Sequence, residues 1–480
     1  MGQTIIAADQ RLSQSILWQI QRHYFRQNGL KAWQEDVVPH AISCNPVMAR
    51  AYSDIVFGYL RDCWAAVQAG DPTFDPTQPI YIVELGAGSG RLLFHFLHDF
   101  YPRLHQAPFA HWHIKCVLTD FVPSILEFWQ AHPKLQPWVE LGVLDFALFD
   151  VADMRPLSLV HAQQTLVPAA QPNPLILFAN YFFDSIPQDS FVIEEGQLCH
   201  NLLTVLSRQP EPDLANPTLW ERLSLAYEPI PLFDAPYDNE IYNDILAEYE
   251  AVLPDTRLTF PNVGLDCVRF WQGDEVGRNG RLLLLSSDRG HTLPESLLND
   301  DDPLPNLHGS FSLMVNYHAI GQYAARCGGQ MLHAPHYQDN LQTVACLFGD
   351  TLAGGQETSR AFAAAITSGG PDDFFALKTA LEPHLHTLTL PQLLSWLRLS
   401  RWDADLFRDC YLTLAAQLAD EPAWHDDVAA ILYQIWAHYL PLRSDDDLAD
   451  KLNQLLTIMG RLADVSDDGR RTTDDRMDGG

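Results

Sequence analysis

The sequence predicts an open, largely parallel α/β sheet with three additions: an N-terminal helical cap, a large insertion and a C-terminal all-α domain. From about residue 80, short apolar strands alternate with helical segments, which is typical of parallel strands joined by right-handed crossovers. Residues 197–280 are less regular and contain clustered prolines, so we interpret them as an insertion into the sheet. Between 372 and 459, apolar residues recur three and four positions apart, which indicates helices.

The domain boundaries follow from these changes in pattern. The strands expected in the sheet are 80–85, 114–119, 139–144 and 175–179 before the insertion, and 282–286 after it. The expected parts are a helical cap at 1–75, a core at 76–352 that contains the insertion, a glycine-bearing linker at 353–370, a helical domain at 371–463 and a disordered acidic tail at 464–480.

Composition and charge argue against several classes of protein. The chain of 480 residues has 30 Lys and Arg against 61 Asp and Glu, a net charge of −31, which disfavours nucleic acid and anionic membranes and favours cationic partners. It has no apolar run of 18 residues and no signal-peptide pattern, and its eight cysteines form no C-x-x-C pair. We therefore expect a soluble, reduced, cytoplasmic protein. No metal site is expected, because His333 and His336 have no third ligand at a suitable spacing.

The strongest motif is YIVELGAGSGR, which ends at Arg91, the start of a predicted helix. Glycines at alternate positions after a strand allow left-handed backbone, and the helix N-terminus offers free N–H groups to a ligand. A dinucleotide fingerprint would need glycine at position 91, so the spacing favours S-adenosylmethionine (SAM) over NAD or FAD. An ordinary glycine-rich turn is the alternative. The candidate cofactor-binding residues in the motif are Glu84, Gly86, Ala87, Gly88 and Gly90.

Carboxylates near the ends of the next two predicted strands are candidates for the rest of the cofactor. Asp120 closes the second strand, where it can accept both ribose hydroxyls, with Phe121 beside it; capping the following helix is its alternative role. Asp145, at the predicted end of the third strand, can accept from the adenine amino group while Phe146 stacks on the ring. Asp150 is the competing candidate for that role.

The fourth strand is followed by polar residues among aromatic ones. Asn180, Tyr181 and Asp184 are the candidate catalytic residues, and Asn180 also counts as a cofactor contact, because this strand end faces the transferring methyl group in such a fold. A dry, oriented site suits displacement at a sulfonium. The alternative is that Phe182 and Phe183 belong to the core and that the acidic residue caps a turn.

The run from the glycine loop to Asn180-Tyr181-Phe182-Phe183-Asp184-Ser185-Ile186-Pro187 resembles the MidA-like class I SAM-dependent methyltransferases, relatives of the mitochondrial complex I assembly methyltransferase. The segment 282–290, LLLLSSDRG, is similar to the family's leucine-rich strand that ends in Asp-Tyr-Gly. The resemblance covers about residues 20–350. It implies a class I (Rossmann-like) methyltransferase sheet, SAM as the cofactor, and a peptide or protein nitrogen, in particular arginine, as the methyl acceptor.

Two departures from the family pattern bear on the acceptor. Tyr181 stands where the family has Glu, and Ser-Asp-Arg-Gly replaces the Asp-Tyr-Gly ending. A cationic arginine needs carboxylates to hold and deprotonate it, and the candidates for that task are Asp184, Asp189 and Asp288. The C-terminal helices resemble a tetratricopeptide (TPR)-like extension, which would bind a basic peptide or protein substrate or form a homo-oligomer. A small-molecule methyltransferase and a catalytically silent assembly protein remain the alternatives.

Overall fold

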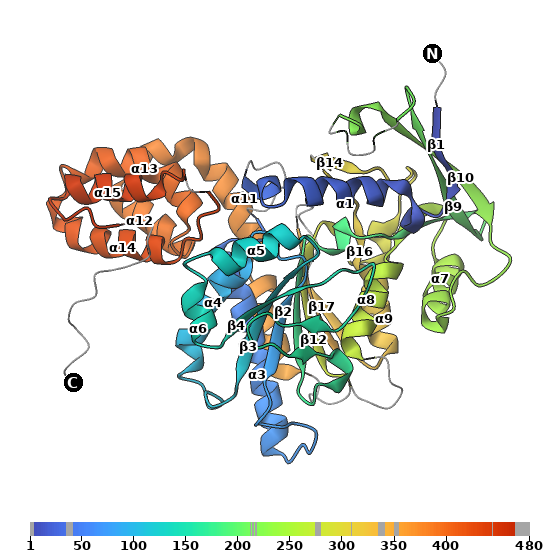
Figure 1. Ribbon diagram of the computed structural model, residues 1–480, viewed down its shortest axis with the longest axis horizontal. Coiled ribbons are helices and arrows are strands. Elements are labelled where there is room, and N and C mark those ends of the chain that lie inside the picture. The colour runs from blue at the N-terminus through green and yellow to red at the C-terminus, as the bar shows by residue number, and fades with distance from the viewer. Residues whose placement is uncertain are drawn as a thin grey trace.

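The computed structural model describes residues 4–34, 42–211, 213, 216, 218–273, 280–308, 310–334, 341–349, 355–443 and 445–465. Most of the tail expected at 464–480, the start of the linker expected at 353–370, and His336 lie outside the described residues. Figure 1 shows a central sheet between helices, a smaller sheet near the N-terminus and a separate group of helices at the C-terminal end.

The central sheet has seven strands, and five neighbours, β12 to β4, run parallel. Strand β18 is antiparallel to both of its neighbours. This order is the class I (Rossmann-like) methyltransferase sheet, so the predicted fold class is confirmed. The strands in spatial order are β17 (Gln330–His333), β18 (Gln342–Phe348), β12 (Leu282–Asp288), β7 (Leu175–Asn180), β2 (Ile80–Glu84), β3 (Ile114–Asp120) and β4 (Leu144–Leu148).

Helices cover both faces of this sheet, which is why its strands are apolar almost throughout. In strand β12, LLLLSSD, every residue is buried. Two hydrophobic clusters, one on each face, hold the layers together. On one face lie α3 (Pro46–Gln68), α4 (Arg91–Leu104), α5 (Pro123–Ala131) and α6 (Gln136–Glu140); on the other lie α7 (Glu240–Val252), α8 (Asn262–Gln272) and α9 (Tyr317–Arg326).

The third parallel strand lies later in the chain than predicted. Residues 136–140 form helix α6, Gly142 turns the chain at φ 72°, and strand β4 begins only at Leu144. The apolar run from Val139 is therefore not a strand, because a helix that packs on a sheet is apolar on one face too. This shift changes which acidic residue stands at the end of the strand.

The N-terminal part is not wholly helical, contrary to the prediction for 1–75. Strand β1 (Thr4–Gln10) pairs with β9 of the inserted region, so chain segments nearly 200 residues apart share a second sheet. The insertion also begins earlier than residue 197, with β8. The second sheet contains β1, β9 (Gln197–Ser207), β8 (Asp189–Glu194) and β11 (Thr256–Phe260), and β10 (Leu223–Pro231) pairs with β9. Helices α1 (Ile16–Asn28) and α2 (Lys31–Gln34) follow β1. Short strand pairs lie elsewhere: β5 (Leu157–Ser158) with β6 (Thr165–Leu166), β13 (Gly290–His291) with β16 (Val315–Asn316), and β14 (Asn306–His308) with β15 (Ser310–Ser312).

The described part of the predicted linker is a helix packed on the core. Helix α10 (Gln356–Phe362) continues into a π-helical turn at 363–367, and both Phe362 and Ile366 are buried. The Asp62 carboxylate of α3 accepts the first N–H groups of α10, including that of Thr358 at 2.8 Å. Gly58 allows the close approach, since a Cβ there would lie 2.6 Å from a carbonyl oxygen of α10. Helix α10 thus covers part of α3.

The remaining helices form a region with its own hydrophobic core. They are α11 (Pro371–Leu381), α12 (Leu390–Leu399), α13 (Ala404–Leu418), α14 (His425–Ala437) and α15 (Leu448–Ile458), called here the C-terminal helical region. Among the described residues, no helix is both long enough and apolar enough to cross a membrane.

Candidate functional site

A cavity of about 490 Å³ opens at the carboxyl ends of strands β2, β3, β4 and β7. This is the edge at which open α/β sheets bind ligands. It brings together most of the residues proposed from the sequence: Glu84, Gly86, Ala87, Asp120, Phe121, Asn180, Tyr181 and Asp184. Of the residues proposed for the cofactor, Gly88, Gly90, Asp145 and Phe146 do not line it, and of those proposed for the acceptor, Asp189 and Asp288 do not.

The glycine loop has the left-handed backbone that its spacing predicts. Gly86, Gly88 and Gly90 have φ values of 60°, 51° and 75°, which side-chain-bearing residues adopt only with strain. A Cβ on Gly88 would lie 2.6 Å from the Trp33 ring, and one on Gly90 would lie 3.1 Å from Trp129. The second and third glycines therefore shape the loop from outside the cavity, whereas Gly86 faces into it.

Two buried carboxyl groups flank the loop. Glu84 accepts the N–H of Leu93 at 3.2 Å, and burial, together with the charge of Asp120, raises the pKa of Glu84 to about 8. Asp120 accepts the N–H groups of Gly88 at 3.1 Å and Val122 at 3.0 Å, while burial raises its pKa to about 6. A bound ammonium or hydroxyl group would add a donor that favours the ionised form of these buried carboxyls.

The third acidic position is Asp150 and not Asp145. Asp145 lies inside β4, and its carboxylate accepts three backbone N–H groups, of Phe146 at 2.8 Å, His161 at 2.9 Å and Ala162 at 2.8 Å. Phe146 is fully buried in the core and lies near Trp129. The predicted strand ended at 144 instead of 148, which placed these two residues at the ligand-binding edge, whereas neither of them lines the cavity.

At the true end of β4, Phe149 and Asp150 line the cavity. Arg22 of α1 donates from Nη1 to Asp150 Oδ1 at 2.9 Å and lies over the Phe121 ring at 4.6 Å. Burial opposes ionisation of Asp150, but the hydrogen bond from Arg22 prevails and lowers its pKa. Asp150 is thus an ionised acceptor beside an aromatic ring, the setting that an adenine amino group needs.

The end of β7 is held by a buried polar network. Asn180 donates from Nδ2 to the carbonyl of Ser43 at 2.9 Å and accepts from the hydroxyl of Tyr52. The Tyr52 hydroxyl also lies 2.9 Å from that of Ser287 on the next strand. Tyr181, which follows, has a φ of 47°, an unusual conformation for a residue with a side chain. Such strain is typical of functional sites, where the surrounding structure enforces it.

Asp184, which lines the cavity, forms a buried carboxyl pair with Asp288, which lies behind it. Asp288 accepts the Phe183 N–H and the Tyr317 hydroxyl, each at 3.2 Å, yet the Oδ1 atoms of Asp184 and Asp288 have no donor among the described residues. Burial raises the pKa of Asp184, against the nearby Arg289 cation; burial and the charge of Asp184 raise that of Asp288. Burial and mutual repulsion disfavour the ionisation of both carboxyls at once, so a pair of this kind can share one proton and leave one carboxylate as a base.

Asp189, the third carboxylate proposed for the acceptor, is engaged elsewhere. It is buried in β8, where it accepts from Arg11 at 2.7 Å, the Ser13 hydroxyl at 2.6 Å and Tyr237 at 2.7 Å. It does not line the cavity. Asp189 anchors the segment around Arg11 to the inserted sheet, so it is not placed to bind the molecule that receives the methyl group.

Several cavity residues were not found from the sequence. Phe182 lines the cavity while Phe183 packs in the core against Tyr317, which settles the role of that pair. Other lining residues come from segments that are distant in the sequence. The spacing of apolar residues, which identifies strands and helices, does not predict which distant residues meet at the cavity. Among these additional lining residues are Trp18, Phe25 and Trp33 near the N-terminus, Arg289 just after β12, Phe311 and Ser312 of β15, and Phe375 of α11.

Comparison with known proteins gives only distant likenesses. No protein-family model and no curated protein sequence matches the chain. The chain is similar to a COG1565 superfamily protein from Burkholderia thailandensis, at 11% identity, a TM-score of 0.42 and coverage of 73% of this chain and 90% of that one. A second COG1565 superfamily member from that organism, bound to S-adenosyl-homocysteine, matches at 12% identity and a TM-score of 0.38, over 61% and 64%. The CurJ carbon methyltransferase matches at 11% and 0.27, over 59% and 52%. The COG1565 superfamily is the MidA-like group that the sequence motifs resemble.

Proposed function

We propose that this chain is a SAM-dependent methyltransferase that transfers a methyl group to a nitrogen of a peptide or protein side chain. One observation carries the proposal: a single cavity joins the glycine loop and its acids to Asp184, whose buried carboxyl lies beside that of Asp288 on strand β12. The fold agrees with it. A MidA-like neighbour of this fold is bound to S-adenosyl-homocysteine (SAH), the product that SAM leaves after methyl transfer.

The residues present fit the cofactor. Glu84 is a buried acceptor at the glycine loop and suits the ammonium group of the methionine end. Asp120 would accept the ribose hydroxyls, and Asp150, with Phe121, would hold the adenine ring. A side chain at Gly86 would stand 3.1 Å from the Phe182 ring and close the space that the ligand needs.

Bound SAM supplies an electrophilic methyl group, and the chain's own residues prepare the acceptor. Asn180 and the strained Tyr181 would orient the acceptor nitrogen. The Asp184 carboxylate would accept the proton that the acceptor nitrogen loses when it is methylated. The unpartnered Asp184 Oδ1, at 5% exposure of the residue, is the atom available for this proton.

The negative charge of the protein favours a basic nitrogen as the methyl acceptor, whereas the aromatic lining of the cavity favours a different class of molecule. The net charge of −31 attracts basic peptides, and the carboxyl pair suits a basic nitrogen. The aromatic end of the cavity, formed by Trp18 and Phe311, supports a small aromatic molecule as the second candidate acceptor.

Two experiments test the proposal in sequence. Calorimetry should detect SAH binding to the wild type, weaker binding in Asp150→Ala, and wild-type binding in Asp153→Asn, an exposed carboxylate of the same loop that serves as the control. Absence of SAH binding at millimolar ligand would reject the cofactor. Mass spectrometry of basic peptides and of small aromatic compounds incubated with methyl-labelled SAM then identifies the acceptor atom. Binding without any labelled product would instead indicate a silent assembly protein.

A further inference from the structure

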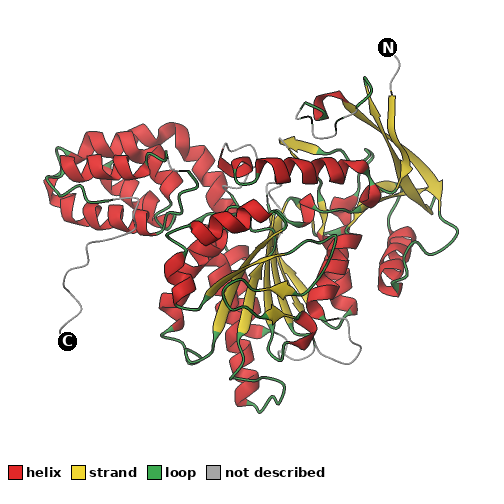
Figure 2. Ribbon diagram, viewed as in Figure 1, coloured by secondary structure: helices red, strands yellow, loops and turns green. Residues whose placement is uncertain are grey.

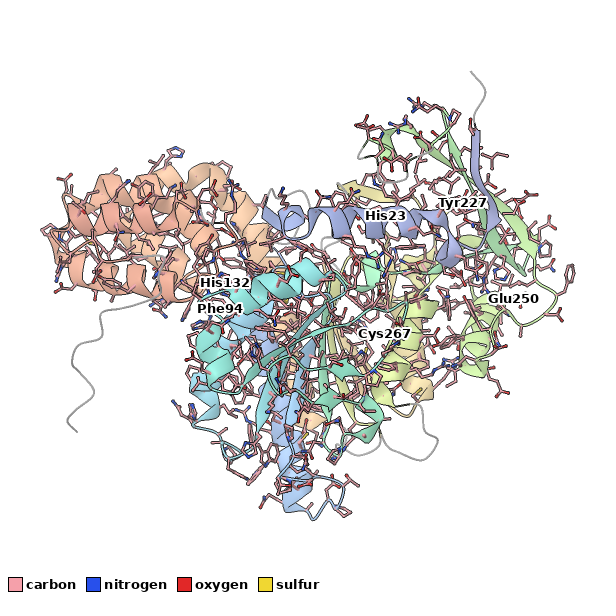
Figure 3. The ribbon with its side chains drawn as sticks, viewed as in Figure 1. His23, Phe94, His132, Tyr227, Glu250 and Cys267 are labelled. Carbon is pink, nitrogen blue, oxygen red and sulfur yellow. The ribbon has the colours of Figure 1, made fainter. Side chains whose placement is uncertain are left out.

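The C-terminal helical region docks on the core next to the glycine loop. Lys134, just after α5, donates to the carbonyl of Tyr439 at 2.8 Å and also to that of Trp436. The ring of His132 lies 2.9 Å from the carbonyl oxygen of Pro441, at the junction visible in Figure 3. These contacts fix the loop after α14 against the loop after α5.

Arg91 makes the contact closest to the cofactor loop. It is the first residue of α4 and directly follows Gly90; its Nε donates to the carbonyl of Leu440 at 3.3 Å and its Nη2 to the Tyr439 hydroxyl at 3.4 Å. Nη1 lies 3.8 Å from Asp405, and the guanidinium lies over the Tyr439 ring. The side chain is 12% exposed, so water screens these interactions weakly.

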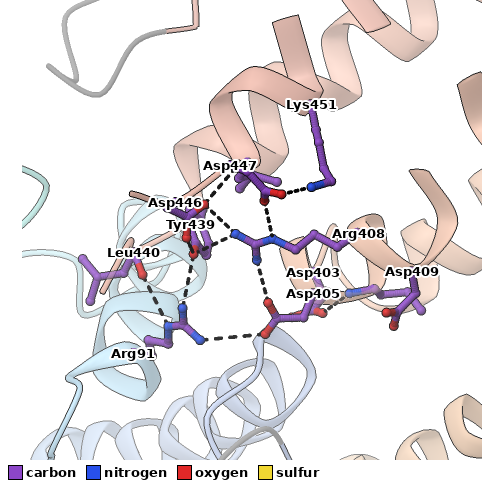
Figure 4. Close-up of polar contacts among 12 residues, drawn as sticks. Arg91, Asp403, Asp405, Arg408, Asp409, Tyr439, Leu440, Asp446, Asp447 and Lys451 are labelled. Atoms are coloured by element: carbon purple, nitrogen blue, oxygen red, sulfur yellow. Dashed lines mark hydrogen bonds and ion pairs between the residues drawn. The ribbon is translucent and has the colours of Figure 1, made fainter. Parts of the chain in front are cut away.

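The partners of Arg91 are themselves tied together inside the helical region (Figure 4). Arg408 donates to Asp405 at 2.8 Å, to the Tyr439 hydroxyl at 3.0 Å and to Asp446 at 2.6 Å. Arg91 therefore contacts a cross-linked group that joins α13 to the segment after α14, and not a single mobile side chain. Such a network holds its geometry better than an isolated surface ion pair.

Two adjacent phenylalanines of helix α11 pack against different hydrophobic clusters. Phe375 lines the cavity and packs against the core of the sheet domain. Phe374 packs within the helical region, where its ring stacks on that of Trp396 with centroids 5.0 Å apart. The two residues have the same chemistry and the same helix but face different hydrophobic clusters.

We propose that the C-terminal helical region completes the ligand site: Phe375 contacts the bound cofactor, and Arg91 is the positioning residue that holds the region against the glycine loop. The inference rests on the proposed function for the identity of the ligand. An aromatic wall excludes water from the reacting centre and offers a favourable surface to a sulfonium cation. The cofactor site then depends on residues more than 200 positions beyond the glycine loop.

The deciding experiment compares Phe375→Ala with Phe374→Ala in the full chain. Phe375→Ala should weaken SAH binding by about tenfold, the factor that corresponds to ~1.4 kcal/mol, and Phe375→Leu should restore most of it. Phe374→Ala should lower the melting temperature while the SAH dissociation constant stays within about twofold of wild type. Equal SAH affinity in the wild type and Phe375→Ala would overturn the proposal.

A second pair of variants tests the role of Arg91. Arg91→Met and Lys134→Met each remove contacts to the same segment of the helical region, but only the first lies on the glycine loop. Arg91→Met should weaken SAH binding several-fold more than Lys134→Met. Equal losses would mean that docking in general, and not the loop contact, matters, and would overturn the role given to Arg91.

A ligand-free measurement separates this inference from the proposed function. Cys44 is half-buried and lines the same cavity as Phe375. Alkylation of Cys44 by iodoacetamide, followed by mass spectrometry, should be faster in Phe375→Ala than in Phe374→Ala. If the wild type binds no SAH, the proposed function fails, and equal alkylation rates would then also reject the wall at Phe375.

Discussion

The two groups of buried acids at the cavity, one beside the glycine loop and one around Asp184, are held in different ways. At the glycine loop, Glu84 and Asp120 accept backbone N–H groups, so these carboxyls also organise the loop. After the fourth strand and at the end of β12, respectively, Asp184 and Asp288 each keep an oxygen with no donor among the described residues. The first group has the properties of a binding site and the second those of a proton acceptor. The comparison teaches that burial alone does not assign a role; the hydrogen-bond partners do.

The largest expected effect would come from Asp184. Asp184→Asn should lower kcat by ~100-fold or more, the usual contribution of a general base, and change SAH affinity by less than about threefold. Single-turnover methylation and calorimetry on the same preparation measure both quantities. A parallel loss of SAH binding would move Asp184 into the cofactor site and remove the difference between the two groups.

Substitution of Asp120 should have the opposite effect: it should weaken SAH binding and change kcat little. Asp120→Ala removes a charged acceptor and also frees the Gly88 N–H, so SAH binding should weaken by about 10- to 100-fold. The turnover at saturating SAM should change much less. The exposed Asp153→Asn again serves as the matched control. An unchanged SAH affinity would reduce Asp120 to a residue that only supports the turn before α5.

Gly88 offers a less clean test than Asp120. The sequence suggests that Gly88→Val would abolish SAM binding in an intact fold. A side chain there meets both the left-handed backbone and the Trp33 ring, so a loss of binding would be accompanied by a loss of stability. Melting curves of the ligand-free variant would show this directly.

Asp288 should make the stability of the protein depend on pH. Its folded-state pKa is raised, so the native state binds more protons than the unfolded chain, and stability falls as pH rises above the ordinary carboxyl range. Asp288→Asn removes this loss while it can still accept from Tyr317. The stability that the variant gains over wild type should be larger at pH 8 than at pH 5, as measured by denaturant unfolding. An equal difference at both pH values would contradict the shared proton.

The smallest expected effect concerns long-range attraction. If a basic peptide is the acceptor, its apparent KM should rise roughly two- to threefold as salt increases, because exposed charges are screened within about 8 Å at physiological ionic strength. SAH affinity, set by buried groups, should hardly change. A salt-independent KM would favour the neutral aromatic acceptor over the peptide.

Sequence reasoning located the glycine loop and the acids next to it because their signals are local. Glycine spacing determines which residues can adopt positive φ, and the apolar run before it determines the strand, so Glu84, Gly86 and Asp120 could be identified without a structure. It misplaced Asp145 because an amphipathic helix and a buried strand have similar short apolar runs. One shifted strand end was enough to exchange Asp145 for Asp150.

By itself, the sequence determined that strands and helices alternate along the chain and that the first strand ends in an acidic residue and a glycine loop, since both depend on backbone preferences over a few residues. The tertiary structure alone decided which distant residues meet there. The pairing of β1 with β9, the packing of α10 on α3, and the division of Phe374 and Phe375 between two cores depend on contacts across hundreds of residues. Such contacts form because apolar faces must be covered, and many faces of similar character compete for that task until the whole chain has folded.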